Sequence, residues 1–394
     1  MTTLPPQPLV GMPCSGVADR SIGICGSYGG LNLGDEAILT VALEQLRIAV
    51  PGVELTVFTR DVGHTRQHHD VDRVIDARSA FRDELVAEIG RLDLLLLGGG
   101  GILYDRESES YLHVPRIAQA LSVPTATYAI GAGPLARHEE RRAVADVLNH
   151  MVAITVRDPE TRRLLEHIGV TAEIAVTADP ALLLTPAPVP AGELEFRGID
   201  RERHLVGMSV REPGGTTHGL EVGVYHRLLA NAADFVAERF DANLLFVPME
   251  RQDIGHAHRV IAEMGSPDRA WVLQGTYGPR EVLGLMGELD LAIGMRLHFV
   301  IFAALSGVPV VALPYASKVT GFLECLGLPT PHMVQREHAG ALLAAIDRIW
   351  DLREEHSRLV DARMPGMQEE SRMTAPLIAG LLAREVPRAA AGPA

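Results

Sequence analysis

The chain has 394 residues, more than one hydrophobic core usually supports, so we expect two domains. Its net charge of −14 argues against nucleic-acid binding, because contact with a phosphate backbone requires a basic surface. Three cysteines without CxxC spacing exclude a disulfide framework and a cysteine zinc site. Neither a secretory signal nor a membrane span is recognisable in the sequence, and we therefore expect a cytoplasmic protein.

Strand-like and helix-like segments alternate along the first half, which is typical of βαβ units and a parallel sheet. The expected strands are Ser21–Cys25, Leu55–Thr59, Asp93–Leu97, Thr125–Ile130, Ala153–Val156 and Glu173–Thr177. The clearest helical patterns are Glu36–Ile48, Arg82–Arg91, Glu139–Met151 and Pro159–His167.

A proline-rich run over Thr185–Glu193 lacks periodicity, and we interpret it as a linker. The pattern then restarts, with strands expected at Leu205–Val210, Leu244–Val247, Trp271–Leu273, Leu291–Ile293 and Pro309–Leu313. Helices are expected at Val222–Phe240, Ile254–Met264, Arg280–Gly287, Leu297–Ser306 and Ala339–Leu352. We set the domains at 20–184 and 201–360, with a linker over 185–200 and a C-terminal helix and disordered tail over 361–394. The sequence thus predicts an α/β fold of two Rossmann-like domains whose open parallel sheets face each other, a GT-B-like architecture.

Glycines and charged residues collect directly after the expected strands of both halves, where open parallel sheets bind their ligands. The segments that follow the strands are Gly26–Glu36, Gly98–Asp105, Gly131–Gly133, Arg157 onward, Arg211 onward, Pro248–Asp253, Gly294–His298 and Pro314–Lys318. We therefore expect a single active-site crevice between the two sheets.

Two glycine-rich segments stand before or beside expected helices. Gly29, Gly30 and Gly34 surround Asn32 just before a helix, where exposed backbone N–H groups favour an anion. The pattern is neither a Walker A loop nor GxGxxG, and for Asp35 we favour a structural role against the helix dipole. The run Gly98–Gly101 fits either close backbone packing or a ligand-facing loop, and we favour the loop.

The segment GMRLHFVIFAALSGVP carries the only charged or titratable side chains of an apolar helix in its first turn, Arg296 and His298. Cations at a helix N-terminus need a compensating anion. Lys318 is the single lysine among 36 basic residues, and it follows the next strand. A compositional bias toward arginine explains the single lysine as well as a functional need for an ammonium group does. We expect Arg296, His298 and Lys318 to form a pocket for phosphate or carboxylate.

Other constellations are weaker. The run His64–Asp70 could ligate a metal, but without a second cluster a solvated loop is the better interpretation. Glu212, Glu250 and Asp253 could act as bases, although spacing alone pairs none of them. No GxSxG elbow is present.

Five blocks of the sequence resemble, in the same order, the polysaccharide pyruvyl transferase family, and the likeness extends from about Ser21 to Lys318. The blocks are GGLNLGDEAIL, LLLLGGGGILYD, ITVRDPET, TADPALLL and GMRLHFVIFAALSGVPVVALPYASKV. The resemblance implies transfer of pyruvate from phosphoenolpyruvate onto two hydroxyls of a sugar, giving a cyclic ketal and phosphate. It implies no metal and no nucleotide cofactor.

The resemblance also assigns residues. Arg296, Leu297 and His298 match the family's donor-binding Arg-Leu-His, Arg157 its arginine in the VRD block, Lys318 its final lysine, and Arg211 the arginine that opens the second domain. His298 is the expected general acid, with Lys318 and Arg157 as further catalytic residues. The expected substrate contacts are Arg296, Leu297, Arg211, Gly29, Gly30, Asn32, Asp35, Gly99 and Gly100. The family often has an aspartate where this chain has Ala316-Ser317.

The resemblance places the donor in the C-terminal domain and the acceptor in the N-terminal domain. The acceptor would be a cell-envelope or extracellular glycan precursor, either free or lipid-linked. A lipid-linked acceptor would bring the enzyme to the cytoplasmic face of the membrane, and a homo-oligomer is compatible with the sequence. Two alternatives stay open: a GT-B glycosyltransferase that uses a nucleotide sugar, with Glu250 on the ribose, and a non-catalytic scaffold in envelope synthesis.

Overall fold

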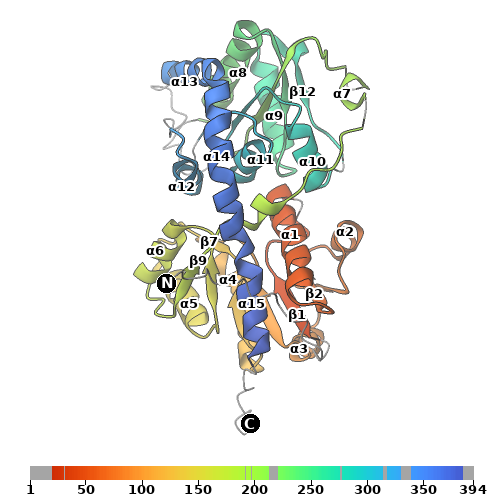
Figure 1. Cartoon of the computed structure of the whole chain (residues 1–394), viewed down its shortest axis with the longest axis vertical. Coiled ribbons are helices and arrows are strands. Elements are labelled where there is room, and N and C mark those ends of the chain that lie inside the picture. Colours follow the sequence, from red (N-terminus) through yellow and green to blue (C-terminus); the bar gives the residue numbers. More distant parts are fainter. Residues whose placement is uncertain are drawn as a thin grey trace, which may run out of the picture.

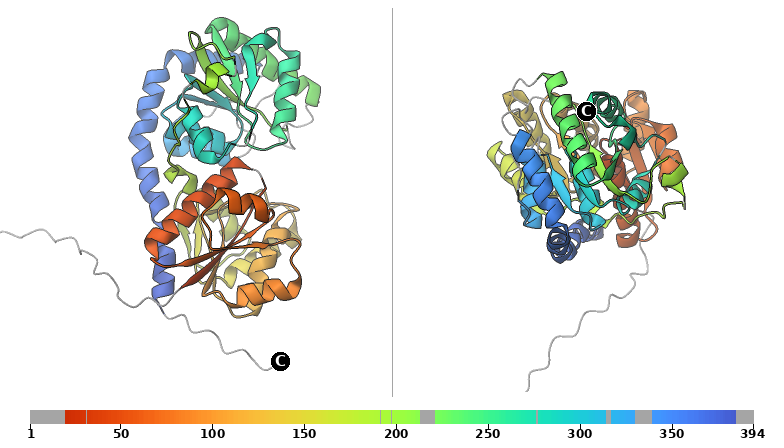
Figure 2. Two further views of the ribbon diagram at one scale, coloured as in Figure 1. Left: turned by 90° about the vertical axis from the view of Figure 1, so that its right-hand side faces the viewer. Right: turned by 90° about the horizontal axis from the view of Figure 1, so that it is seen from above.

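A computed structural model describes residues 20–30, 32–190, 192–196, 198–212, 221–275, 277–313, 317–329 and 339–384. Two α/β lobes lie one above the other, and a long C-terminal helical segment runs along both (Figures 1 and 2). The predicted tail at 389–394 and the loop residues 314–316 lie outside the described residues. No helix in the described ranges is long and apolar enough to cross a membrane.

The N-terminal lobe is built from alternating strands and helices, as the sequence predicts. Its strands are β1 (Ser21–Cys25), β2 (Glu54–Thr59), β3 (Arg73–Asp76), β4 (Leu94–Leu97), β5 (Gly100–Leu103), β6 (Thr125–Thr127), β7 (Ile130–Ala132), β8 (Ile154–Val156) and β9 (Ile174–Val176). Its helices are α1 (Leu33–Ala49), α2 (Val62–His68), α3 (Arg82–Gly90), α4 (Ser108–Ala120), α5 (His138–Asn149), α6 (Pro159–His167) and the short 3₁₀ turn η1 (Pro180–Leu183).

The strands of this lobe form two parallel sheets, whereas the sequence suggested one. One sheet has the order β3-β2-β1-β4-β6 and the other β5-β7-β8-β9. The split follows from residues with positive φ: Gly100 (94°) separates β4 from β5, and Ala129 (48°) separates β6 from β7. Such left-handed residues interrupt the extended backbone, and the predicted strand Thr125–Ile130 is therefore divided between β6 and β7. The prediction of a loop over Gly98–Gly101 was wrong for its second half, because Gly100 and Gly101 begin β5. A bridge between Ala126 and Ala153 keeps the two sheets adjacent.

The C-terminal lobe contains one parallel sheet of order β12-β11-β10-β13-β14. Its strands are β10 (His204–Ser209), β11 (Ala242–Phe246), β12 (Ala270–Val272), β13 (Leu291–Gly294) and β14 (Val310–Ala312). Its helices are α8 (Val222–Arg239), α9 (Asp253–Glu263), α10 (Pro279–Met286), α11 (Leu297–Leu305), α12 (Ser317–Leu326) and α13 (Ala339–Asp351), with the 3₁₀ turn η3 at Pro267–Arg269. All five strands that the sequence predicts here are present within one or two residues of their expected ends.

The chain crosses between the lobes twice. The first crossing is the proline-rich segment with the short helix α7 (Glu193–Phe196), which is fastened to α10 where the Ala187 N–H donates to the Arg280 carbonyl at 2.8 Å. The second is α14 (Arg353–Arg372) followed by α15 (Thr374–Ala383). Residue 361, where we placed a boundary, lies inside α14. Val360 and Met364 of α14 pack in the C-terminal core, and Ala375 and Ile378 of α15 pack against α1.

The two lobes meet at the start of α1. Leu33 N–H donates to the Met249 carbonyl at 2.9 Å, and the Asn32 amide donates to Glu250 Oε1 at 2.7 Å. Both acceptors follow β11, so the carboxyl ends of strands from the two lobes face one crevice. Asn32 also caps α1 by accepting from the Gly34 and Asp35 N–H groups. The same turn thus begins the helix and joins the lobes.

Gly98 illustrates how tightly α1, β1 and the β4–β5 junction pack. A Cβ at Gly98 would collide with the ring and hydroxyl of Tyr28, which is fully buried and has no space to move. We therefore expect Gly98→Ala to lower the free energy of unfolding by about 1–3 kcal/mol, measured by urea denaturation. Tyr28→Phe serves as the matched change. Its lost hydroxyl has no hydrogen-bond partner in the described structure, so this variant should keep or gain stability.

The double variant Gly98→Ala/Tyr28→Phe should recover part of the loss, because the hydroxyl is the nearest atom in the collision. If the effects of the two substitutions on the free energy of unfolding were additive, the collision with the Tyr28 hydroxyl would not be the cause of the loss.

Candidate active site

A buried carboxylate, Asp179, lies at the centre of the crevice. It follows β9 and caps η1 by accepting from the Ala181 N–H at 3.0 Å. Arg157 Nη1 donates to Asp179 Oδ2 at 2.8 Å, and His298 Nε2 lies 3.5 Å from the same oxygen. Arg157 comes from the N-terminal lobe and His298 from α11 of the C-terminal lobe. Asp179 therefore joins two predicted site residues that lie 141 positions apart in the chain.

His298 is held against the first turn of α1. A Cβ at Gly34 would collide with the Nδ1, Cγ and Cε1 atoms of the imidazole, so only glycine permits this approach. The His298 side chain is 12% exposed, and its Nε2 has no geometrically ideal hydrogen bond among the described residues. The imidazole is thus held between Gly34 and the Asp179 carboxylate, and a histidine fixed in this way is suited to proton transfer.

Arg157 and Lys318 approach each other over Gly101. The point where a Gly101 Cβ would lie is 3.4 Å from Arg157 Nη2 and 3.6 Å from Lys318 Nζ. Gly131, on the neighbouring strand β7, lies under the guanidinium of Arg157, and the point where a Gly131 Cβ would lie is 2.8 Å from Nε. Two glycines therefore make room for two cations. This arrangement can hold a small anion such as a phosphate or carboxylate.

Lys318 lies in the first turn of α12, not in a loop as the sequence suggested, and it is half-buried. The preceding residues 314–316, which include Ala316 of the departure noted above, lie outside the described ranges. The backbone of Ser317 begins the helix.

Arg296 is the N-cap residue of α11, but its side chain does not join Arg157, His298 and Lys318. Its guanidinium donates to both oxygens of Glu250, at 2.7 and 2.8 Å, and to both oxygens of Asp253, at 3.1 and 2.6 Å. Of the expected pocket residues, His298 and Lys318 thus lie with Arg157 in one group, whereas Arg296 is bound to two carboxylates. These carboxylates supply the anion that a cation at a helix N-terminus requires.

Leu297 and Arg211 are also placed apart from the cluster. Leu297 is 6% exposed and packs in the hydrophobic core with α11 and its neighbours. Arg211 follows β10, its Nε donates to the Glu212 carbonyl, and its own carbonyl accepts from the Tyr225 hydroxyl at 2.9 Å. Residues 213–220 beyond it lie outside the described ranges.

The glycine-rich segments have mixed roles. Gly99 packs against Ile38 and the Tyr128 carbonyl, and Gly100 lies under Asp35 Oδ1, so these glycines pack against α1. Gly101 faces the cations. Gly29 has a φ of 68° and donates its N–H to Glu36, while Gly30 packs on Arg60.

Burial and neighbouring charges set opposite pKa shifts on the two central aspartates. Burial alone would raise the pKa of Asp179, but His298 and then Arg157 hold it well below the usual range of an aspartate. Burial raises the pKa of Asp35, and the opposing effect of His298 is smaller. Asp179 is therefore a permanent anion, whereas Asp35 is the more readily protonated of the two carboxyls.

Asp179 is the residue that we did not single out, although it belongs to the TADPALLL block. The sequence contained a signal for it. Asp179 is an acidic residue that follows the end of an expected strand, and the preceding expected strand is followed by Arg157. Glu250 and Asp253, which spacing could not pair, are paired by Arg296.

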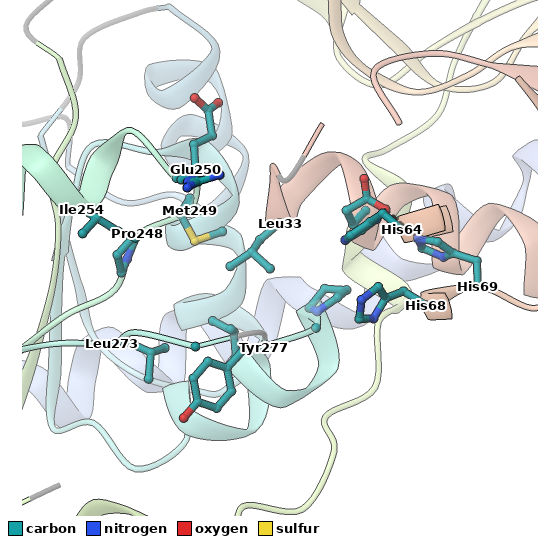
Figure 3. A pocket seen from close by; sticks show the side chains of 16 residues that line it. Leu33, His64, His68, His69, Pro248, Met249, Glu250, Ile254, Leu273 and Tyr277 are labelled. Carbon is teal, nitrogen blue, oxygen red and sulfur yellow. Dashed lines mark hydrogen bonds and ion pairs between the residues drawn. The ribbon is translucent and has the colours of Figure 1, made fainter. Parts of the chain in front are cut away.

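The histidine-rich run also differs from our expectation. His64–His68 belongs to helix α2, and His69 Nε2 lies 2.6 Å from Glu36 Oε2. These side chains line a separate pocket between the lobes (Figure 3). In the described residues no group of three or more histidine, cysteine or acidic side chains is arranged to hold a metal ion.

Replacing Asp179 by asparagine should destabilise the protein by about 3–5 kcal/mol at pH 7, because Arg157 would be left buried without its counter-charge. A carboxyl with a depressed folded-state pKa contributes stability above its unfolded pKa, near 3.8, and that stability is lost as the pH falls below it. The difference between wild type and Asp179→Asn should therefore shrink between pH 5 and pH 3 in urea denaturation. A difference that stays constant over this interval would contradict the ionised pair.

Comparisons with known proteins identify the family of this chain. The family model described as polysaccharide pyruvyl transferase matches residues 32–317. A relative, the amylovoran biosynthesis protein AmsJ of Erwinia amylovora, is 23% identical over 290 residues, which cover 70% of this chain and 69% of AmsJ.

Solved structures with the same fold are distant in sequence. A putative UDP-N-acetylglucosamine 2-epimerase from Listeria monocytogenes has a TM-score of 0.64 at 14% identity, covering 95% of this chain and 98% of its own. Anabaena HepE, solved in complex with UDP, has a TM-score of 0.60 at 14% identity, covering 92% and 99%. Sucrose-phosphate synthase from Thermosynechococcus elongatus has a TM-score of 0.58 at 14% identity, covering 93% and 99%. These likenesses show the GT-B fold, and the family match over most of the chain shows that this protein belongs to the polysaccharide pyruvyl transferase family.

Proposed function

We propose that this transferase moves pyruvate from phosphoenolpyruvate onto two hydroxyls of a sugar in a cell-envelope or extracellular glycan precursor. The observation that carries the proposal is the group of Arg157 and His298 at Asp179 with Lys318 beside Arg157, where Gly101 and Gly131 leave room for the cations. Phosphoenolpyruvate carries its phosphate and its carboxylate on the same carbon, and such a cluster matches both charges.

His298 is proposed as the general acid. Protonation of the methylene carbon of phosphoenolpyruvate makes the adjacent carbon an oxocarbenium-like centre. A sugar hydroxyl attacks that carbon and loses its proton, which balances the proton delivered. A second hydroxyl then attacks the same carbon and the bond from that carbon to the phosphate oxygen breaks. The leaving phosphate takes up the proton of the second hydroxyl as the ketal closes. Asp179 orients the imidazole, because its carboxylate is buried and its Oδ2 lies 3.5 Å from Nε2.

Arg157 and Lys318 would hold the phosphate while its charge increases during departure. Arg157 is held by its hydrogen bond to Asp179 and by packing over Gly131. Its guanidinium therefore needs little rearrangement to bind the phosphate. Arg296, tied to Glu250 and Asp253, would position the first turn of α11 and with it His298.

The alternative is a GT-B glycosyltransferase that uses a nucleotide sugar. The second pocket between the lobes, which Glu250 helps to line, is the observation in its favour. Both oxygens of Glu250 are already bound to Arg296, however, and Oε1 also accepts from Asn32. Calorimetry with phosphoenolpyruvate and with a UDP-sugar distinguishes the two functions, since each predicts tight binding of only one.

His298→Ala should leave phosphoenolpyruvate binding within about threefold but reduce phosphate release by at least about 10²-fold, the usual contribution of a general acid. Binding is measured by calorimetry and release with a panel of sugar acceptors. His138→Ala, on the exposed start of α5, is the control and should be active. Near-normal release by His298→Ala, with an unchanged melting temperature, would remove His298 from the chemistry.

Lys318→Arg should weaken phosphoenolpyruvate binding by about tenfold or more, although the charge is kept. The ammonium lies 3.6 Å from the position of a Gly101 Cβ, opposite the guanidinium of Arg157, and a second planar guanidinium is too large for that space. Lys318→Met should bind no better than Lys318→Arg. Wild-type affinity in Lys318→Arg would show that only charge is needed, and wild-type affinity in both variants would show that the lysine takes no part.

A further inference from the structure

A second cavity of about 340 Å³ opens between the lobes and is not used by the proposed donor chemistry. Figure 3 shows Pro248, Ile254 and Leu273 of the C-terminal lobe on one side and the histidines of the N-terminal lobe on the other, with Leu33 between them. Met249, Tyr277, Pro279 and Val282 complete an apolar lining. This volume lies at the small end of the range for ligand sites, enough for one or two rings.

The two carboxylates of this cavity are already bound to protein groups. Glu36 accepts from the Gly29 N–H at 2.9 Å and lies 2.6 Å from His69 Nε2, while Glu250 is bound to Arg296. Burial, followed by the neighbouring His64 and His69, lowers the pKa of His68. Arg251, which is exposed, also lines the cavity, and His64 Nδ1 has no hydrogen-bond partner among the described residues. In contrast to the cluster of Arg157, His298 and Lys318, this cavity therefore offers a ligand mainly apolar and imidazole surface.

Flat surfaces are present on both sides. The rings of His64 and His68 lie 4.4 Å apart at an angle of 38°. Across from them, the Tyr277 hydroxyl donates to Glu193 Oε1 at 2.8 Å, which fixes the ring. The point where a Gly275 Cβ would lie is 3.0 Å from that ring, so the absence of a side chain at Gly275 leaves room for it. Aromatic and imidazole faces of this kind favour a planar ligand.

The cavity and His298 share one structural element. Leu33 and Glu36 of the first turn of α1 line the cavity, whereas Gly34 of the same turn contacts His298. The cavity therefore lies about one helix width, ~10 Å, from the general acid. A sugar ring at His298 could extend its substituent into the cavity.

We propose that this cavity, the aglycone pocket, binds an uncharged, planar ring attached to the acceptor sugar. The proposal rests on the proposed function, because it assigns the acceptor of that reaction. It predicts that the enzyme selects acceptors by the group attached to the sugar as well as by the hydroxyl pair that receives pyruvate.

The test compares phenyl and methyl β-glycosides of glucose, galactose and mannose by calorimetry with the full chain. At least one phenyl glycoside should bind about tenfold or more tightly than its methyl partner. Equal affinities, or no binding by any phenyl glycoside at 10 mM ligand, roughly the weak limit for a specific site, overturn the proposal. Uridine is a further probe, and preference for uridine over every phenyl glycoside would also overturn it in favour of a nucleotide site.

Variants locate the ring. Ile254→Trp should fill the aglycone pocket and abolish the phenyl preference, whereas Ile48→Trp, the same change at a residue 71% exposed on α1, should keep it. Tyr277→Ala should lose the preference and Tyr277→Phe should retain it, because the ring, not the bond to Glu193, forms the wall. A preference that survives both Ile254→Trp and Tyr277→Ala would place the ring elsewhere and overturn the proposal.

Phosphoenolpyruvate binding in the same samples separates the two proposals. Phenyl preference without phosphoenolpyruvate binding would sink the proposed donor chemistry and leave the pocket assigned. Phosphoenolpyruvate binding without phenyl preference would sink only the pocket.

Discussion

The arrangement of the site depends on one buried carboxylate that binds cations from both lobes. Asp179 accepts from Arg157 of the N-terminal lobe and lies within ion-pair distance of His298 of the C-terminal lobe. Its carbonyl also accepts from the Ser371 hydroxyl of α14 at 3.1 Å. Removing a charge from water costs several kcal/mol, so a buried anion of this kind persists only where its partners stay in place. The relative position of the lobes and the ionisation of Asp179 therefore depend on each other, because separating the lobes would withdraw His298 from Asp179.

A carboxylate inside a site proposed for an anionic substrate needs a physical reason. Without Asp179, the buried Arg157 and the half-buried Lys318 would repel one another and favour an open crevice. Asp179 offsets that repulsion while occupying only Arg157 Nη1, and Nη2 faces Gly101 and Lys318. The raised pKa of Asp35, against the depressed pKa of Asp179, adds a second carboxyl of different character within the same crevice. Environment rather than residue type thus decides which acid is charged.

The alternation of strands and helices was enough to predict the α/β class, every strand of the second half and the strand ends at which the cations lie. The division of the first half into two sheets was not predictable, because it depends on positive φ at Ala129, a residue type that gives no warning of it. Arg296 was expected among the substrate ligands, yet its direction is decided by Glu250 and Asp253, which lie more than forty positions away in sequence. Hydrophobic periodicity predicts where a helix or strand begins and ends and which of its faces is buried. Ion pairs between residues more than forty positions apart depend on the assembled fold.

The first turn of α1 shows why donor and acceptor geometry are linked. Gly34 faces His298, Asp35 faces Gly100, and Leu33 with Glu36 faces the aglycone pocket, so four consecutive residues contact both parts of the crevice. Asn32 caps the same turn and bonds to Glu250, which in turn holds Arg296 at the start of α11. A helix is rigid over one turn, so a shift at the pocket moves Gly34 relative to the imidazole by a similar amount. Acceptor recognition on this element would therefore affect the rate of proton transfer as well as binding, and the two need not separate into independent sites.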